Sequence, residues 1–270
     1  MASSKAEQTI YSPQSSASGI YEDTFTEKEL EELRELAVKI LNENEWIAPL
    51  IPELVIRQSV EWYAQLFIGN LLKQINPKGD EITLEEFKIV AENYLVIYNL
   101  NGAKWFKEAF ELACLEELKS HFENINVLSD ANLKISPVHV TSSSGKKTFN
   151  KDAQFKVWDE KIINGKHVIS LDDIGDRGTT QETIRERLVT DGALSTTTVN
   201  LVEKIVPDDI DEEHKKKHSP DIALLQAAYH FLLGWGLDDG KREATRDFNT
   251  IVILDSKPAE SIISFQGGLN

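Results

Sequence analysis

Residues 167–180 read His167-Val-Ile-Ser-Leu-Asp172-Asp173-Ile-Gly-Asp176-Arg177-Gly178-Thr179-Thr180 and combine an apolar run, three acids and a glycine-threonine turn. The run from Val168 to Leu171 is typical of a strand buried in a parallel sheet, and such a strand is not expected to hold acids within its run. We therefore expect the strand to end before Asp172, so that Asp172 and Asp173 emerge at its carboxyl end. That edge is where open α/β sheets bind their ligands.

The turn after this strand has the features of a phosphate site. Apolar residues recur at helical spacing at Ile184 and Leu188, so the turn from Asp176 to Thr180 opens a helix. Backbone N–H groups at a helix N-terminus, together with threonine hydroxyls, can hold a phosphate. The acids Asp172 and Asp173 beside it suit ribose hydroxyls and Mg²⁺. Taken alone, the stretch is also compatible with a structural turn, a metal site or an acyl-phosphate site.

The rest of the chain alternates strands with helices. Short apolar runs predict strands at 94–100, 135–140, 155–158, 167–171 and 195–202, and helical spacing predicts helices at 105–113 and 179–190. This alternation predicts an α/β fold with a central, mostly parallel sheet flanked by helices. Three more short strands, at 222–225, 231–235 and 251–254, are expected to form a small hood beside the main sheet.

The sequence divides into four parts. Residues 1–22 are rich in Ser, Ala and Gln and predict a disordered or loose tail, whereas residues 23–93 are mainly helical, with capping boxes beginning at Thr26 and Thr83. Residues 94–206 hold the core sheet, and residues 207–270 hold the hood and the C-terminal strands. The helical part can be read as a separate domain or as helices packed on the sheet, and we favour the second interpretation.

Charge and cysteine content exclude several classes of function. The chain of 270 residues carries 45 acidic against 29 basic side chains, a formal net charge of −16, which disfavours binding to nucleic acid or to anionic membranes. No apolar run approaches the roughly 18 residues of a membrane helix, and the N-terminus lacks the apolar segment of a signal peptide. The single cysteine, Cys114, permits no intramolecular disulfide. We expect a cytoplasmic protein.

Four further segments occur in the order that one enzyme family would need. They are Leu100-Asn101-Gly102, Leu201-Val-Glu-Lys204, Phe231-Leu232-Leu-Gly-Trp-Gly-Leu-Asp238 and Arg246-Asp-Phe-Asn. Together with residues 167–180, they resemble the hypoxanthine-guanine, or 6-oxopurine, phosphoribosyltransferase family over about residues 95–254. The resemblance implies a type I phosphoribosyltransferase fold with a hood, to which this chain adds extra N-terminal helices.

The resemblance also implies roles for the residues around the phosphate turn. Asp176 would be the general base that takes the proton from the purine N7. The ribose and 5′-phosphate of phosphoribosyl pyrophosphate would be held by the acids and the turn, which are Asp172, Asp173, Asp176, Arg177, Gly178, Thr179 and Thr180. Asn101, Gly102 and Arg246 would lie at the pyrophosphate, where the missing Cβ of the glycine permits close approach.

The purine and the metal are assigned in the same way. Lys204 would donate a hydrogen bond to the 6-oxo group, and Phe231, followed by Leu232, would stack on the base. Asp238, with Asp172 and Asp173, would bind Mg²⁺. Each assignment has a structural alternative: an aromatic residue of an apolar run can belong to the core, a lysine can end a strand in solvent, and Arg246 can form a surface ion pair.

The sequence departs from the family pattern at several of these positions. Arg177 stands where threonine is usual, Gly175 where an apolar residue is common, and Asn101 where a basic residue is common. The expected mobile loop from Thr141 to Lys147 lacks the Ser-Tyr pair that closes over the reacting centre in the family. These departures place the capacity for turnover in question.

The resulting hypothesis is a Mg²⁺-dependent phosphoribosyltransferase of purine salvage. It would convert hypoxanthine or guanine and phosphoribosyl pyrophosphate to IMP or GMP and pyrophosphate. Two alternatives remain: an inactive relative that binds a nucleotide or phosphoribosyl pyrophosphate, and a transferase with another acceptor, such as xanthine or a pyrimidine. The expected partners are these small molecules and further copies of the chain, in a dimer or tetramer, with no nucleic acid and no membrane.

Overall fold

A computed structural model describes residues 46–77, 81–100, 102–141, 154–206, 218–237, 246 and 248–255. Several predictions lie outside these residues. They concern the tail at 1–22, the helix expected from Thr26, the loop residues 142–147, and the two site residues Asn101 and Asp238. The fold below is that of the described residues.

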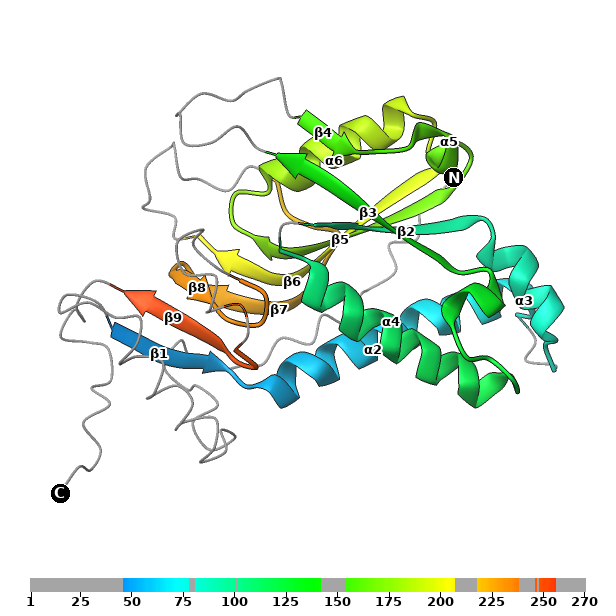
Figure 1. The fold of residues 1–270 in the computed structure, drawn as a ribbon, viewed down its shortest axis with the longest axis horizontal. Coiled ribbons are helices and arrows are strands. Elements are labelled where there is room, and N and C mark those ends of the chain that lie inside the picture. The colour runs from blue at the N-terminus through cyan, green and yellow to red at the C-terminus, as the bar shows by residue number, and fades with distance from the viewer. Residues whose placement is uncertain are drawn as a thin grey trace, which may run out of the picture.

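The core is a six-stranded, mostly parallel sheet (Figure 1). Its strands, in the order in which they lie in the sheet, are β4 (Gln154–Val157), β3 (Lys134–Thr141), β2 (Tyr94–Asn99), β5 (His167–Gly175), β6 (Ser195–Ile205) and β7 (Ile222–Ala228). Only the edge strand β4 runs antiparallel to its neighbour. The predicted α/β fold is confirmed.

Side chains of alternate residues in β2 and β5 enter two different cores. Val96, Ile169 and Leu171 pack with α2 (Glu53–Ile75), α3 (Leu84–Ala91), α4 (Lys104–His121) and η2 (Leu128–Ala131). Leu95 and Val168 pack instead with α5 (Glu160–Ile163) and α6 (Thr179–Thr190). Helices therefore cover both faces of the sheet, as Figure 1 shows.

The strand β5 is longer than its apolar run predicts. It continues through both acids to Gly175, because β6 remains paired with it: Asp172 faces Asn200, and Gly175 faces Glu203. The expectation that the strand ends before Asp172 is therefore wrong. Backbone hydrogen bonding to a long neighbour, rather than side-chain polarity, decides where this strand ends.

A second, three-stranded antiparallel sheet forms the hood. It consists of β1 (Trp46–Ile51), β9 (Ile251–Asp255) and β8 (Phe231–Leu233), in that order. The run at 222–225 does not belong to it, because β7 pairs in parallel with β6 in the main sheet. β1 was not predicted either, since it lies in a part of the chain interpreted as helical.

The helices α2 and α3 contribute side chains to the same core as the sheet. Thr83 and Glu86 form the predicted capping box at the start of α3, in which Thr83 N donates to Glu86 Oε2 at 2.8 Å. In α2, the ring of Tyr63 stacks on Phe110 of α4 with 5.5 Å between centroids, and Phe67 lies 5.8 Å from the same ring. All these aromatic rings belong to the main core.

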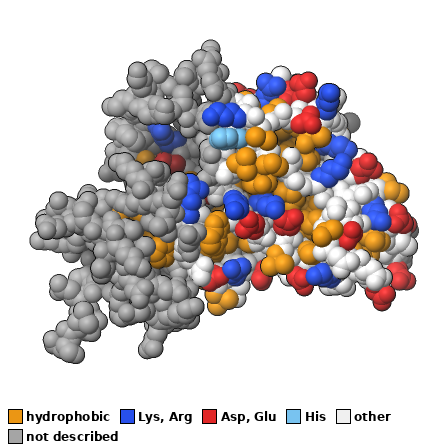
Figure 2. Space-filling view, viewed as in Figure 1, with side chains coloured by type: hydrophobic (Ala, Val, Ile, Leu, Met, Phe, Trp, Pro, Cys, Tyr) orange, Lys and Arg blue, Asp and Glu red, His pale blue; other side chains and the backbone are white. Residues whose placement is uncertain are grey.

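The described part of the chain contains no helix that is both long and apolar enough to cross a membrane. On the face drawn in Figure 2, basic, acidic and apolar side chains of the described residues are interspersed, and they form no broad basic surface there. The expected absence of a nucleic-acid partner stays a prediction. The cytoplasmic location stays a prediction.

The shared core of α2, α4 and the sheet predicts a single unfolding transition. Phe110→Ala should lower the free energy of unfolding by about 3–5 kcal/mol, because Phe110 is fully buried among three aromatic rings. Phe110→Leu should cost less. Urea unfolding followed by fluorescence and circular dichroism tests this expectation, and two separate transitions, with only one affected, would show that α2 and α3 fold apart from the sheet.

Candidate functional site

The site lies at the carboxyl end of β5 and begins with the turn that links β5 to α6. Gly178 precedes the first turn of α6 and has a φ of 78°, in the left-handed region that favours glycine. Glu182 N donates to the Gly178 carbonyl at 3.1 Å and starts the helix. This arrangement turns the first N–H groups of α6 away from the sheet, as a phosphate cradle requires. Thr179 and Thr180 are the first two helical residues.

The two acids of β5 lie in contact with each other, and Asp173 N donates to Asp172 Oδ1 at 3.2 Å. Asp172 is 4% exposed, and its Oδ1 accepts a long hydrogen bond of 3.5 Å from Asn99 Nδ2. Burial, followed by the neighbouring carboxylate of Asp173, raises the pKa of Asp172 well above its usual value. Burial also raises the pKa of Asp173, while the charge of Arg246 opposes that change.

Gly102 lies directly against the Asp173 carboxyl group. A Cβ built on Gly102 would fall 1.5 Å from Asp173 Oδ2, so no other residue fits without displacing the carboxylate. The loop around Gly102 is held by its neighbours: Ala103 N donates to the Asn99 carbonyl at 3.1 Å, and Leu100 N donates to the Val138 carbonyl at 2.9 Å. The glycine of the loop after β2 and the second acid of β5 thus meet.

The hood reaches the same place through a tight turn at residues 234–237. A Cβ on Gly236 would lie 3.1 Å from the carbonyl oxygen of Gly102, and Gly236 N donates to the Arg246 carbonyl at 2.9 Å. Arg246 is close enough for its charge to act on Asp173. Gly102, Asp173 and Arg246 therefore converge, although they are far apart in the sequence.

Lys204 joins the phosphate turn to the hood. Its ammonium lies 3.9 Å from Asp176 Oδ2, 5.6 Å from the ring centroid of Tyr229 and 5.9 Å from that of Phe231. The residue is 9% exposed, and burial lowers its pKa, an effect that the Asp176 carboxylate opposes. Lys204 is therefore not a strand end in free solvent. Asp176 and Phe231, which were both assigned to the purine, therefore both lie near Lys204.

The aromatic segment of β8 divides between surface and core. Phe231 is 45% exposed, whereas Leu232 and Trp235 are buried in the main core. The exposed ring is available to a ligand, and Trp235 has the structural role that its apolar surroundings suggested. Because the Leu232 side chain points away from Phe231, only its backbone is placed for a contact with a base, and its role stays a prediction.

Comparison with known proteins yields similarity in structure only. No family model and no curated protein matches the sequence. Among solved structures, a hypoxanthine phosphoribosyltransferase of Trypanosoma cruzi is 19% identical, with a TM-score of 0.56 over 80% of this chain and 94% of that chain. A lysine-to-arginine mutant of the Trypanosoma cruzi enzyme, in a ternary complex with substrates, is 20% identical, with a TM-score of 0.56 over 79% and 97%.

A further solved structure is a glutamic acid mutant made to analyse an invariant aspartic acid of hypoxanthine phosphoribosyltransferases. It is 19% identical to this chain, with a TM-score of 0.57 over 80% of this chain and 98% of that one. The chain adopts the type I phosphoribosyltransferase fold. At this level of identity the likeness shows the fold, and the chemistry has to be argued from the residues.

The presence of glycine at position 175 is explained by Asn200, which the sequence analysis did not single out. A Cβ on Gly175 would fall 2.3 Å from Asn200 Nδ2, so the side chain of Asn200 occupies the space that an apolar residue would need. Asn200 is fully buried, and its Oδ1 accepts a hydrogen bond of 3.0 Å from Gln181 Nε2 in the first turn of α6. Gly175 therefore leaves room for Asn200, whose side chain links β6 to the start of α6.

Sequence reasoning missed Tyr229, Asn200 and Gln181. Tyr229 lies only two residues before Phe231, yet nothing in the sequence shows that the turn between β7 and β8 points its ring at Lys204. Asn200 lies within a strand whose apolar pattern it interrupts, and that interruption was the one available signal. The contacts of Asn200 with Gly175 and Gln181 depend on the register of β6, which the sequence does not reveal.

The pairing of Gly175 with Asn200 predicts strong energetic coupling. Gly175→Ala should lower the free energy of unfolding by about 1–3 kcal/mol, because the new methyl group overlaps the Asn200 amide. Combined with Asn200→Ala, it should cost at least about 1 kcal/mol less than the sum of the single changes. Urea unfolding of all four proteins gives the coupling.

Gly69→Ala is the matched control, because an added Cβ there meets nothing within 4 Å and Gly69 lies in the middle of α2. It should be neutral or stabilise the protein by up to about 1 kcal/mol. Additive effects of the changes at 175 and 200 would contradict the packing described above.

Proposed function

We propose that the protein is a phosphoribosyltransferase that joins hypoxanthine or guanine to phosphoribosyl pyrophosphate, giving IMP or GMP and pyrophosphate. The observation that carries the proposal is the position of Lys204, whose ammonium lies near Asp176 on one side and the rings of Tyr229 and Phe231 on the other. This places a cation, a carboxylate and a stacking surface around one space at the end of the phosphate turn.

The purine would lie on the exposed face of Phe231, with its 6-oxo group toward Lys204. An ammonium that is largely removed from water donates a strong hydrogen bond to a carbonyl oxygen. It finds no such acceptor at position 6 of the purine when that position carries an amino group. Lys204 therefore favours a 6-oxopurine over adenine. Asp176, beside the lysine, would accept the proton that the purine loses as its ring nitrogen bonds to the ribose.

The 5′-phosphate would contact the backbone N–H groups of Gly178 to Thr180 and the hydroxyls of Thr179 and Thr180. Arg177 is exposed at this turn and adds a positive charge that also suits a phosphate. Gly102 and Arg246 would hold the leaving pyrophosphate, since Gly102 lies against Asp173 and the charge of Arg246 acts on the same carboxyl group. Holding the two phosphate groups apart fixes the anomeric carbon of the ribose next to the base, and positioning of this kind lowers the barrier.

The carboxylates of β5 suit Mg²⁺ in type and number. Mg²⁺ is usually bound by one or two carboxylates together with substrate phosphates and water. Asp173 lies against the Gly102 loop, where pyrophosphate would be, and its pKa is raised by burial, so a nearby cation would stabilise the charged form. The described residues contain no group of three or more acids, histidines or cysteines that could hold a metal alone, so the substrate would complete the site. Bound Mg²⁺ would neutralise the departing pyrophosphate.

One observation favours a non-catalytic alternative. Asp172 is buried and its carboxyl group faces Asn99, so its contact with a ribose would require a rearrangement. A chain in which Asp172 serves only the fold would bind a nucleotide or phosphoribosyl pyrophosphate without turnover. The partners are in either case small phosphorylated molecules; for the quaternary structure, a dimer or tetramer stays a prediction.

A coupled assay of pyrophosphate release, with hypoxanthine, guanine, xanthine and adenine as acceptors and Mg²⁺ present, tests the proposal. Turnover with hypoxanthine or guanine, and none with adenine, is the expected result. Binding of phosphoribosyl pyrophosphate without turnover of any base would support the non-catalytic alternative. Turnover of xanthine alone would change the acceptor and keep the role of Lys204, because xanthine also carries a 6-oxo group, whereas turnover of adenine alone would refute that role.

Asp176→Asn should lower kcat by about 10²- to 10⁴-fold, because the amide cannot accept a proton, whereas the affinities for both substrates should change little. Glu186→Gln is the matched control, since it removes one negative charge from the exposed side of α6. It should leave kcat unchanged. Equal kcat values for wild type and Asp176→Asn would remove Asp176 from the role of base.

A further inference from the structure

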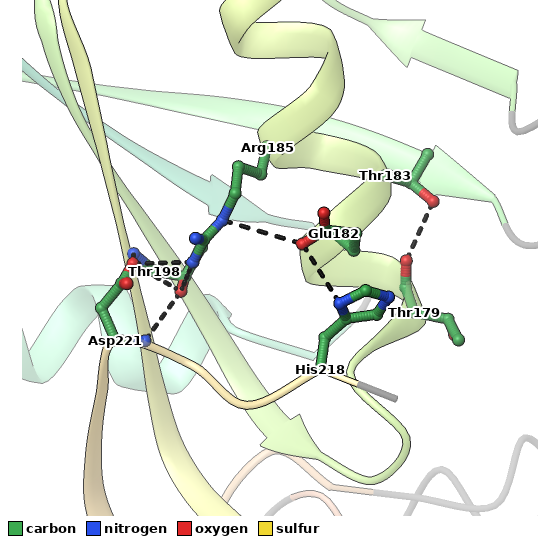
Figure 3. A network of polar contacts seen from close by, with 7 residues as sticks. All are labelled: Thr179, Glu182, Thr183, Arg185, Thr198, His218 and Asp221. Carbon is green, nitrogen blue, oxygen red and sulfur yellow. Dashed lines mark hydrogen bonds and ion pairs between the residues drawn. The ribbon is translucent and has the colours of Figure 1, made fainter. Parts of the chain in front are cut away.

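The short segment His218 to Asp221, which leads into β7, lies against the phosphate turn (Figure 3). At one end of this segment, His218 contacts the turn, and at the other end Asp221 contacts β6 and α6. We refer to residues 218–221 as the bracket.

The first end of the bracket rests on Arg177 and Gly178. His218 N donates to the Arg177 carbonyl at 3.3 Å, and the His218 carbonyl oxygen lies so close to Gly178 that a Cβ there would fall 1.9 Å from it. The ring also reaches α6, with Nδ1 3.5 Å from Glu182 Oε2. Gly178 is therefore required for its positive φ and for its contact with the bracket.

The second end is held by Asp221. Its Oδ2 accepts hydrogen bonds from Thr198 N at 2.7 Å and from Arg185 at 2.8 Å, and Asp221 N donates to Thr198 Oγ1 at 3.0 Å. Thr198 is buried in β6, so its backbone N–H depends on this carboxylate for a partner. Arg185 lies one turn beyond Glu182 in α6 and ion-pairs with it at 3.8 Å. Figure 3 shows the resulting chain of contacts from Asp221 through Arg185 and Glu182 to His218.

We propose that the bracket holds the phosphate turn in its binding conformation, and that Asp221 and Glu182 are positioning residues for the phosphate of the substrate. The inference rests on the proposed function, because it assumes that residues 178–180 bind a phosphate. The turn has a particular need for such support, since Gly178, at a φ of 78°, allows its backbone wide conformational freedom. Contacts that fix the turn before binding reduce the entropy lost when a phosphate binds.

Neither positioning residue touches the space around Lys204 and Phe231. The bracket contacts the backbone of residues 177–178 and the outer side of α6, whereas the purine would lie next to Lys204 and Phe231. A change in the bracket should therefore weaken the binding of phosphate and leave the binding of the base alone. This separation distinguishes a positioning role from a general loss of stability.

The experiment compares a nucleotide with its nucleoside in wild type and in Asp221→Asn and Glu182→Gln. Isothermal titration with GMP and guanosine, and with IMP and inosine, gives two dissociation constants for each pair. The dissociation constant of the nucleoside divided by that of the nucleotide measures the benefit of the phosphate. Both substitutions should reduce this ratio by about tenfold, which is the effect expected when a binding group is slightly misplaced. The dissociation constant of the nucleoside should stay the same. In turnover, KM for phosphoribosyl pyrophosphate should rise while KM for the base should not.

Asp191→Asn is the matched control, because it removes a partly buried ion pair, with Arg187, at the opposite end of α6. It should lower the melting temperature without changing the ratio. An unchanged ratio in Asp221→Asn and Glu182→Gln, with wild type binding nucleotides more tightly than nucleosides, would overturn the bracket and leave the proposed function standing. If wild type gains nothing from the phosphate, the phosphate site and the bracket are both refuted.

Discussion

The hydrogen-bonded pairing of β5 with β6 determines where the acids of β5, Asp176 and Lys204 lie in the site. The two strands remain in register through Ile174 with Val202 and Gly175 with Glu203. Their next residues, Asp176 and Lys204, therefore emerge side by side, which explains their separation of 3.9 Å. The same pairing buries Asp172 within the strand, at an energetic cost that an apolar residue would not incur.

The hood and the turn that leads into it bring aromatic rings to the polar groups of the main sheet. β7 ends and turns back into β8, and this turn carries Tyr229 and Phe231 over Lys204. β1, from the start of the described chain, pairs with β9 and so ties the hood to α2 and the main core. The N-terminal helix α2 is therefore part of the scaffold that holds the hood.

The sequence predicted most of this architecture, because the strands of a parallel sheet appear as short apolar runs and the helices appear as apolar residues at helical spacing. It failed where pairing overrides local pattern. β5 continues through two acids, β7 joins the main sheet, and β1 forms in a region interpreted as helical. The contacts of Asn200 and Tyr229 depend on register and on a turn and could not be predicted, although Asn200 interrupts the apolar pattern of its strand.

The central claim is that Asp176, Lys204 and Phe231 surround one nucleotide whose phosphate lies on the turn that follows β5. A crystal structure of the protein with GMP or IMP tests it most directly. We predict that the purine stacks on Phe231 with its 6-oxo group toward Lys204, and that the phosphate contacts the backbone of Gly178 to Thr180. A nucleotide bound elsewhere, or one whose phosphate lies away from this turn, would contradict the account.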